Sequence, residues 1–208
     1  MEYKTVSEPC EASFTEKKSE FIGYLSPVSS EEEAVAFIEK IRAMHRKATH
    51  NCYAYILREN GIARHSDDGE PSGTAGVPIY EVLRREGLSD VCCVVTRYFG
   101  GVLLGAGGLV RAYTRGAKDA VGAARIRLMA SAAELCVTVD YGMYGRLAQI
   151  FAEADARVAA EDFSESVRIT VYVREDAAEQ LKGDLIEACN GCVDVKIAQK
   201  LNYDFAQK

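Results

Sequence analysis

The sequence predicts an α+β protein of two domains, and two observations lead to this class. Segments with strand-like alternation and segments with helical spacing succeed one another through all 208 residues. The charge is unevenly distributed: residues 1–130 contain 17 basic and 17 acidic residues, whereas residues 131–208 contain 8 and 14, so the formal net charge of −6 lies in the second segment. We therefore expect an N-terminal domain at 1–131, able to fold alone, and a second domain at 132–208.

In the first domain, turn and capping residues separate strands from helices. Pro27 ends an apolar strand, and Ser30 with Glu33 forms a capping box, in which each side chain satisfies an unpaired N–H group at a helix start. Pro78 is tolerated in a first helical turn, and Gly87 is typical of a helix end. These signals predict an α/β domain with strands at 19–28, 50–57 and 91–99 and helices at 31–46, at 78–87 and from Gly107 onward.

The second domain has the alternation of half-buried strands. Leu135, Val137 and Val139 alternate with polar residues, as do the apolar residues of SVRITVYV at 166–173. The expected order is that of the ferredoxin-like βαββαβ unit, with strands at 134–141, 156–162, 166–173 and 193–197 and helices at 146–154 and 177–189.

The outer face of this second sheet is a possible RNA platform. It would display Arg168, Thr170, Tyr172 and Arg174. We favour an ordinary solvated face, because the domain is acidic and lacks the aromatic-rich strand motif of such platforms.

The composition excludes several classes of protein. No apolar stretch approaches the roughly 20 residues that span a bilayer, and MEYKTVSEPCEASF lacks the pattern of a signal peptide. The seven cysteines have no framework spacing, which indicates reduced thiols, so we expect a cytoplasmic protein with no membrane partner. Cys189 and Cys192 form a lone CxxC pair, and no such pair accompanies His45, His50 and His65, so we expect neither zinc nor a cofactor.

The glycine-rich run TRYFGGVLLGAGGLVRAYTRG at 96–116 is the first candidate site. It continues the apolar run VCCVVTRYF, which predicts a strand covered on both faces. The run lacks the Lys-Ser/Thr of a Walker A loop and the third glycine of a dinucleotide fingerprint. A strand, a glycine loop and a helix N-terminus nevertheless suit an anion, because helix N-termini present free N–H groups and a positive dipole end. The predicted anion or nucleic-acid site comprises Arg97, Gly100, Gly101, Gly105, Gly107, Gly108, Arg111, Arg115 and Lys118.

A structural interpretation of the same run stays open. The glycines then serve close packing of the helix, and the arginines form a solvated face. From residue 97 to residue 127 there are six basic residues against Asp119 alone, which favours the anion site.

The loop DDGEPSGTAGVP at 67–78 is the second candidate site. Asp67, Asp68 and Glu70 carry oxygen ligands of the kind that Mg²⁺ prefers, although EF-hand spacing is lacking. We favour the interpretation in which these carboxylates order the loop and balance Arg97 or Arg111, and we expect no metal. The residues with a possible ligand-binding or loop-ordering role are His50, Asp67, Asp68, Glu70, Ser72 and Thr74.

Four blocks resemble the bacterial YigZ/eukaryotic Impact family: KKSEFIGYLSPV, ATHNCYAYIL, DDGEPSGTAGVPIYEVL and VVTRYFGGVLLGAGGLVRAYTRGAKDAV. The resemblance, over residues 17–121, implies a βαβ-type N-terminal domain of the kind found in ribosomal proteins and an elongation factor. The end of the chain resembles the last, ferredoxin-like domain of elongation factor G. The resemblance also implies a link to translation, since eukaryotic relatives regulate translational stress signalling by binding the activator of an initiation-factor kinase. Val77 departs from the family, where we expect a polar or basic side chain.

Two functions are compatible with these patterns. The first is a non-enzymatic regulatory protein that binds RNA, the ribosome or a translation-associated protein through the surface of residues 100–118. The second is an enzyme acting on a phosphorylated small molecule, with His50 as general acid or base and the acidic loop opposite Arg97 and Arg111. We favour the first. A deep, closed pocket would favour the enzyme, whereas an open positive groove would favour nucleic acid.

Overall fold

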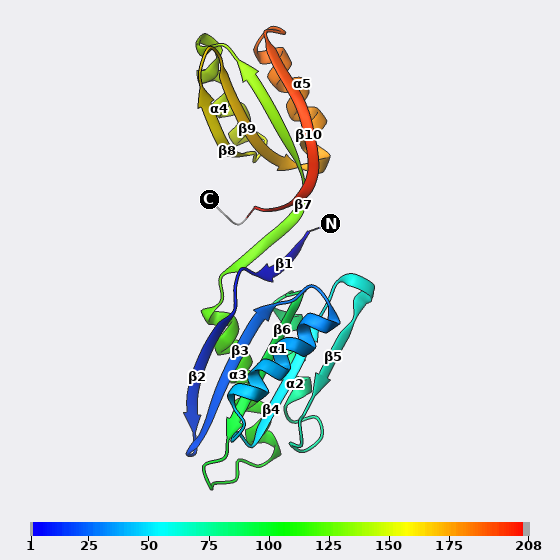
Figure 1. Ribbon diagram of the computed structural model, residues 1–208, viewed down its shortest axis with the longest axis vertical. Coiled ribbons are helices and arrows are strands. Elements are labelled where there is room, and N and C mark those ends of the chain that lie inside the picture. Colours follow the sequence, from blue (N-terminus) through cyan, green and yellow to red (C-terminus); the bar gives the residue numbers. More distant parts are fainter. Residues whose placement is uncertain (1, 206–208) are drawn as a thin grey trace. The chain divides into compact units, whose positions relative to one another are not determined.

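The computed structural model describes residues 2–205 and has two compact units (Figure 1). The N-terminal unit comprises residues 3–127, and the C-terminal unit comprises residues 128–205 together with Glu2. The division falls within one long strand, β7 (Ile126–Val139), rather than in a loop. The described residues form an α+β protein with two sheets, as the sequence predicts.

The N-terminal unit contains six strands and three α-helices among its described residues. The strands are β1 (Tyr3–Val6), β2 (Cys10–Glu16), β3 (Ser19–Pro27), β4 (His50–Ile56), β5 (Ala63–Ser66) and β6 (Val91–Tyr98), and the helices are α1 (Glu31–Met44), α2 (Gly76–Arg85) and α3 (Ala106–Ala123). Five strands make an antiparallel sheet in the order β2-β3-β6-β4-β5. Because β3 and β4 both run antiparallel to β6, they are parallel to each other, and α1 makes the crossover between them.

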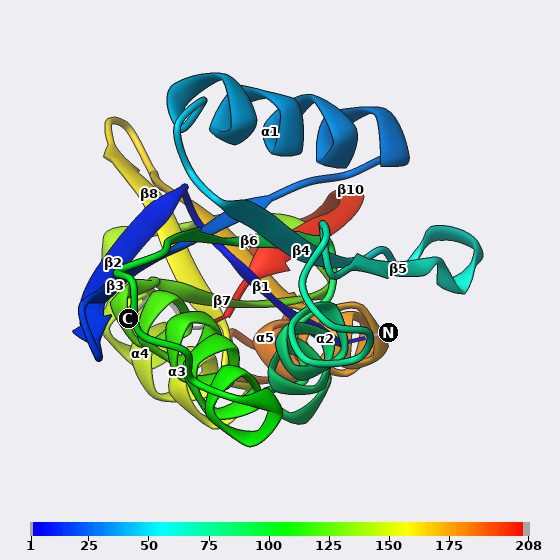
Figure 2. The ribbon, with the colours of Figure 1, turned by 90° about the horizontal axis from the view of Figure 1, so that it is seen from below.

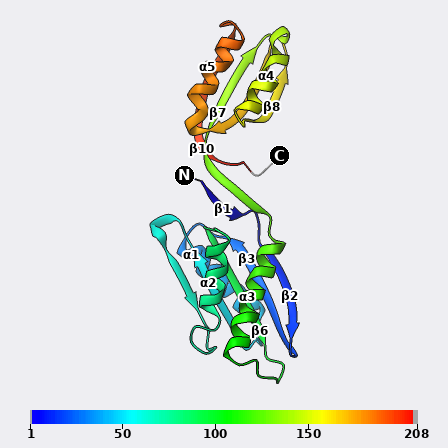
Figure 3. The same ribbon diagram turned by 180° about the vertical axis from the view of Figure 1, so that it is seen from behind.

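Helices cover both faces of this sheet. One face packs on α1, and the other packs on α2 and α3, which lie side by side (Figure 2, Figure 3). The central strand β6 belongs to both cores: Cys93 and Val95 pack toward α2 and α3, and Cys92 and Val94 pack toward α1. The prediction that this apolar run is a strand buried on both faces is confirmed.

The prediction misses β1, β2 and β5. β2 lies at a sheet edge, and none of its seven residues is fully buried, so its apolar positions give a weak hydrophobic signal. β5 has four residues and pairs only with β4 within the described sheet. β1 contributes the buried Val6 to the core, and an isolated bridge joins its Lys4 to Leu88. Short or edge strands are defined by such distant partners rather than by local pattern.

The capping box at α1 is confirmed in part. Ser30 is the N-cap, and its hydroxyl accepts a hydrogen bond from the Glu33 N–H at 3.3 Å. The Glu33 carboxylate bonds the N–H and the hydroxyl of Ser29, at 2.7 and 2.8 Å, instead of the Ser30 N–H that a capping box requires. Gly87 follows α2 with a φ of +69°, which suits the predicted helix end.

Two glycines let α3 approach the sheet closely. A β-carbon placed on Gly23 of β3 would overlap the carbonyl group of Gly116 in α3. A β-carbon on Gly116 would in turn lie 2.9 Å from a methyl group of Val95. The small residues of this helix therefore serve close packing, as the sequence predicts.

The C-terminal unit has the ferredoxin-like arrangement. After β7 come α4 (Tyr141–Glu153), β8 (Arg157–Phe163), β9 (Val167–Arg174), α5 (Ala178–Ala188) and β10 (Val193–Asp204). The strands pair antiparallel in the order β10-β7-β9-β8. This is the order expected of a βαββαβ unit, in which the first and third strands lie at the centre of the sheet.

One face of this second sheet forms the core with α4 and α5. Val167, Ile169 and Val171 of β9 are fully buried there, whereas Arg168, Thr170 and Tyr172 point to the other face, as predicted. Among residues 2–205, no helix combines the length and apolarity needed to cross a membrane.

Candidate functional site

The glycine loop leads into an uncapped helix start. Gly105 is the N-cap of α3, with a φ of +70°, and offers no side chain to cap the helix. The first α-helical hydrogen bond joins the Leu109 N–H to the Gly105 carbonyl, so the N–H groups of Ala106, Gly107 and Gly108 have no partner within the helix. The first turn carries no acidic residue. The start of α3 therefore presents an uncompensated positive dipole end.

The five glycines of the run have different roles. A β-carbon on Gly100 would overlap the backbone of Lys18, and Gly101 and Gly105 have positive φ angles of +81° and +70°, so these three are required by the fold. A β-carbon on Gly108 would lie 3.0 Å from that of Leu104.

Gly107 differs from the other four. The nearest atom to a β-carbon there is Nη1 of Arg111, at 3.6 Å, and no other contact exists within 4 Å among the described atoms. Neither packing nor backbone geometry requires glycine at this position.

Arg111 and Arg115 line a hollow of about 190 Å³ together with Lys17, which the sequence analysis did not include. Lys17 comes from the turn between β2 and β3. The acidic Glu16 precedes it in the lining, and the rest of the wall is formed by Phe14, Leu104, Gly108 and Ala112. We call this the Arg111 hollow. The Arg111 side chain is exposed, and none of the ion pairs found in the described part of the chain includes it.

Two residues of the predicted basic stripe are less free. Arg115 lies with its guanidinium carbon 4.2 Å from the centre of the Phe14 ring and bonds Asp119 at 3.3 Å. Lys118 does not line the Arg111 hollow; it lines a groove of about 430 Å³ between α2 and α3. The stripe is therefore divided between two hollows.

Arg97 corrects the predicted site. Its side chain is not displayed at the surface: the residue is 5% exposed, and Nη1 donates to Glu70 Oε1 at 2.6 Å. Nη2 lies 3.4 Å from the hydroxyl of Ser19, which also accepts the Gly100 N–H at 3.2 Å. The charge of Arg97 is thus compensated by Glu70, and it cannot serve as a free cation beside Arg111.

Glu70 is the centre of a buried polar cluster. The same oxygen, Oε1, accepts a second hydrogen bond from the Tyr113 hydroxyl at 2.8 Å, and burial raises the pKa of that phenol, which keeps it protonated. His50 Nε2 lies 3.9 Å from this oxygen. His50 Nδ1 lies 2.7 Å from the carbonyl of Asp68; since a carbonyl only accepts, Nδ1 carries the hydrogen, and the lone pair of the neutral ring is on Nε2.

This cluster and the glycine loop meet in one pocket of about 390 Å³, which we call the His50 pocket. Its polar lining includes His50, Glu70 and Arg97, and its apolar lining includes Phe99 and Leu103. The remaining wall is formed by Thr49, Gly69, Pro71, Leu104, Gly105, Ala106 and Leu109. Both candidate loops of the sequence analysis thus contribute to one pocket, and Leu104 lines the Arg111 hollow as well.

Asp67 orders the acidic loop and the start of α2. Its Oδ1 accepts the N–H groups of Ala75 and Gly76 at 2.9 and 2.8 Å, and its Oδ2 accepts that of Gly73 at 2.8 Å. Burial alone would raise the pKa of this carboxyl, but the three backbone hydrogen bonds outweigh burial and hold the pKa below its usual value.

The other polar residues of the loop are also engaged locally. Asp68 bonds Nη2 of Arg42 at 2.8 Å and the Asn51 N–H at 2.7 Å. The hydroxyl of Thr74 donates to the Pro71 carbonyl at 2.6 Å, and Ser72 is exposed. Within residues 2–205, no three His, Cys, Asp or Glu side chains come together in a way that could hold a metal ion.

Comparison with known proteins identifies the family. Residues 17–121 match the family described as the Impact N-terminal domain, and residues 137–191 match one described as a domain of unknown function (DUF1949). The chain is 42% identical to the IMPACT family member YvyE of Bacillus subtilis over 198 residues, which cover 93% of this chain and 90% of the relative. The chain belongs to the IMPACT family.

Other IMPACT family members and one solved structure resemble the chain. The family member YigZ of Escherichia coli is 31% identical over 182 residues, covering 86% of this chain and 89% of the relative. The Protein IMPACT homolog of Dictyostelium discoideum is 39% identical over 98 residues, covering 45% of this chain and 28% of the relative. A solved structure titled as the crystal structure of an hypothetical protein is 28% identical, with a TM-score of 0.61, and covers 95% of this chain and 98% of that one.

In this IMPACT family member, three residues singled out by sequence do not line the His50 pocket. Val77, 39% exposed, lines the groove between α2 and α3 rather than the His50 pocket. Cys189 is buried and Cys192 exposed, and Gly191, with a φ of +79°, follows the end of α5 as the expected helix stop.

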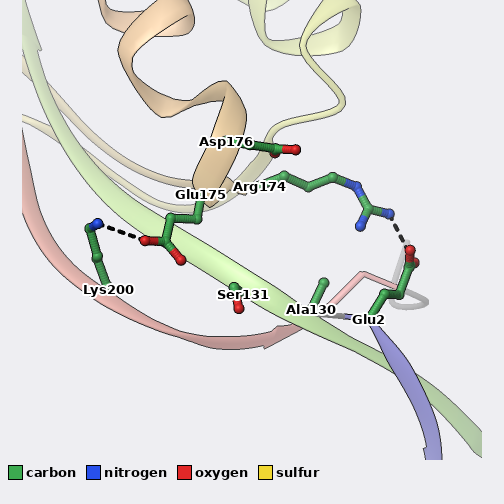
Figure 4. A pocket seen from close by; sticks show the side chains of 7 residues that line it. All are labelled: Glu2, Ala130, Ser131, Arg174, Glu175, Asp176 and Lys200. Carbon is green, nitrogen blue, oxygen red and sulfur yellow. Dashed lines mark hydrogen bonds and ion pairs between the residues drawn. The ribbon is translucent and has the colours of Figure 1, made fainter.

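A second polar pocket of this IMPACT family member lies in the C-terminal unit (Figure 4). It has a volume of about 500 Å³. Its two cations are already paired, Arg174 with Glu2 at 3.2 Å and Lys200 with Glu175 at 2.6 Å. This pocket therefore offers a ligand less free charge than the Arg111 hollow does.

Proposed function

We propose that this protein is a non-catalytic regulatory protein that acts in the cytoplasm by binding RNA of the translation machinery. The RNA backbone lies across the start of α3, with phosphates at the N–H groups of Ala106, Gly107 and Gly108 and in the Arg111 hollow. This binding mode combines a helix N-terminus with separate cations, both of which attract phosphate.

One observation carries the proposal: the guanidinium of Arg111 lies over the first turn of α3, with Nη1 3.6 Å from the position of a β-carbon on Gly107. A cation near the positive end of a helix is unfavourable, because the two charges repel. No acidic residue in the first turn offsets this repulsion, and Arg111 has no described ion-pair partner. An anion between the guanidinium and the helix would remove the conflict, which supports a phosphate at this place.

The surroundings support a local contact rather than bulk attraction. Lys17 and Arg115 add positive charge to the same hollow, where Glu16 is the one acidic lining residue, while the whole chain has a net charge of −6. Binding should then depend on a few phosphate contacts and weaken strongly with salt, since each neutralised phosphate releases counterions.

His50 favours a second candidate, an enzyme acting on a phosphorylated small molecule. Its Nε2 is available as a base in the pocket, 3.9 Å from the Glu70 carboxylate. No activated hydroxyl or thiol accompanies it in the described pocket lining: Thr49 is the only hydroxyl residue there, and the nearby Cys52 is buried, which raises the pKa of its thiol and disfavours the thiolate. Binding is therefore the better-supported function.

The test is the salt dependence of RNA binding. Fluorescence anisotropy with single-stranded and structured RNA is measured for the wild type and for Lys17→Ala/Arg111→Ala/Arg115→Ala. Losing three phosphate contacts should lower the slope of log affinity against log salt by roughly 2 to 3 units. Adding Lys118→Ala should lower it little further, because Lys118 lines another groove.

The matched control is Lys40→Ala/Arg46→Ala/Lys47→Ala, which removes the same charge from exposed positions on and just after α1 that do not line the Arg111 hollow. Equal slopes for the two triple variants, or no RNA binding by the wild type, would overturn the proposal. Co-sedimentation with ribosomes shows whether the RNA partner is ribosomal.

A further inference from the structure

We propose that the His50 pocket takes one unstacked guanine base, whose own phosphate lies at the start of α3. The inference rests on the proposed function, because the same helix start holds the phosphate. It adds a base-reading site to a surface that otherwise contacts only the backbone of the nucleic acid.

The mouth of the pocket is apolar and uncovered. Leu103 is 83% exposed and Phe99 is 46% exposed, and both line the pocket with the more buried Leu109. Large apolar side chains gathered at a pocket mouth mark a binding site more often than an ordinary surface. An aromatic ring there suits a base, since bases stack on aromatic side chains.

One of the residues that line the pocket, Arg97, carries an unsatisfied donor. Nε of the 95% buried Arg97 finds no hydrogen-bond acceptor among the described residues, although the same guanidinium bonds Glu70 and Ser19 through its other nitrogens. Buried N–H groups without acceptors are rare in folded proteins and call for an explanation. A carbonyl oxygen of a ligand in the pocket that Arg97 lines would supply the acceptor.

Two other residues that line the pocket, His50 and Glu70, provide acceptors. His50 Nε2 carries the lone pair of the neutral ring, because Nδ1 is held by the Asp68 carbonyl. The bonds from Arg97 and Tyr113 both go to Oε1 of Glu70, so Oε2 takes neither of them. The cluster is fixed by these internal bonds before a ligand arrives.

One donor and two acceptors match the Watson–Crick edge of guanine. That edge has one acceptor, O6, and two donors, N1–H and the N2 amino group. The same edge of adenine has a single amino donor, and that of uracil has a single imino donor. Single-stranded RNA is commonly recognised through this edge of an unstacked base.

The pocket and the phosphate site are contiguous. Gly105 and Ala106, the N-cap and first residue of α3, line the His50 pocket, and Leu104 lines both this pocket and the Arg111 hollow. The pocket volume of about 390 Å³ lies within the usual range for small-molecule sites. One nucleotide can therefore place its base in the pocket and its phosphate at the helix start.

The experiment compares oligouridines that carry a single central guanosine, inosine or adenosine, by fluorescence anisotropy with the full-length protein. We expect the guanosine oligomer to bind about tenfold more tightly than the adenosine oligomer, and inosine, which lacks the N2 amino group, to fall between them. Phe99→Ala should lower the affinity for the guanosine oligomer about tenfold with an unchanged salt slope, because a stacking contact is lost. Phe163→Ala, an exposed phenylalanine of the C-terminal unit, is the matched control.

The outcomes separate this inference from the proposed function. Equal affinities for all three oligomers, or no effect of Phe99→Ala, would overturn the guanine pocket, while the salt-slope test above would still stand. Guanosine monophosphate is titrated as a second arm. If it binds as tightly as the oligomer, the pocket inference holds and the source is a free nucleotide, which overturns the proposed RNA function.

Discussion

The starts of α2 and α3 lie on the same face of one sheet, yet their backbone N–H groups are treated in opposite ways. At α2, the chain supplies its own anion: the Asp67 carboxylate binds the N–H groups of Gly73, Ala75 and Gly76. At α3, the N-cap is a glycine, the first turn has no acid, and Arg111 lies over it. The first arrangement is complete within the fold, whereas no side chain caps the start of α3.

This difference bears on the stability of the fold at α2 and on the proposed anion binding at α3. The carboxylate at α2 offsets the helix dipole and should strengthen the fold. The start of α3 lacks this stabilisation, and Gly107 adds a further cost, since glycine is a poor helix former. Changes near α2 should therefore lower stability, and changes near α3 should raise it while removing anion binding.

The largest effect is expected at the ion pair between Arg97, at the end of β6, and Glu70 of the acidic loop. Glu70→Ala leaves the buried Arg97 without its carboxylate, which should lower the free energy of unfolding by about 3–5 kcal/mol. The double variant Glu70→Leu/Arg97→Met should recover most of this loss, because no unpaired charge remains buried. Urea unfolding of both variants is the measurement. A single variant as stable as the wild type would show that the pair does not hold the loops together.

The next effect concerns Asp67. Asp67→Ala should lower the free energy of unfolding by about 2 kcal/mol, since hydrogen bonds from three backbone N–H groups to a charged acceptor are lost. Because the folded-state pKa is depressed, this stabilisation is fully present above the unfolded pKa, about 3.9. The difference between the wild type and the variant should be constant from about pH 5 to 7 and shrink as the pH falls through the folded pKa.

Chemical unfolding at several pH values checks this behaviour. Ser72→Ala, in the same loop but exposed, is the control and should leave the stability unchanged. A wild-type advantage that stays constant down to pH 3 would contradict the assigned role of the Asp67 carboxylate.

The smallest effect has the opposite sign. Gly107→Ala should raise the free energy of unfolding by up to about 1 kcal/mol, because alanine favours the helix and its methyl group meets no close contact. Gly107→Glu should add roughly 0.3–1 kcal/mol by placing an acid in the first turn, which makes α3 resemble α2. Both variants should weaken RNA binding, the glutamate more strongly. Thermal unfolding and RNA-binding anisotropy on the same samples test whether stability rises as RNA affinity falls. The prediction fails if Gly107→Glu binds RNA as well as the wild type does.

The sequence predicts the regular parts of the fold because their signals are local. Capping and stop residues place α1 and α2 to within two residues, and strict alternation places β9. The edge strand β2 escapes because its half-buried residues alternate too weakly, and β7 starts at Ile126, well before the strict alternation that begins near Leu135.

The candidate site is less predictable because its contacts join distant segments. The glycine run and the acidic loop are visible in the sequence, but their meeting in the His50 pocket is not. A local pattern cannot tell that Arg97, at a strand end, is buried against Glu70 rather than exposed. No local sequence pattern marks Lys17 as a site residue, because only the pairing of β2 with β3 brings their turn toward Arg111.

The contact between Gly23 and Gly116 extends the influence of the sheet to the helix start. Because a helix is stiff, the distance between α3 and the sheet at Gly116 also sets the distance of its first turn from the sheet, about two and a half turns away. A side chain on Gly23 would push α3 away from the sheet and displace its uncapped N–H groups, although Gly23 lines neither the Arg111 hollow nor the His50 pocket. Through the contact between these two glycines, a strand beneath the helix determines the position of the proposed phosphate site at the helix start.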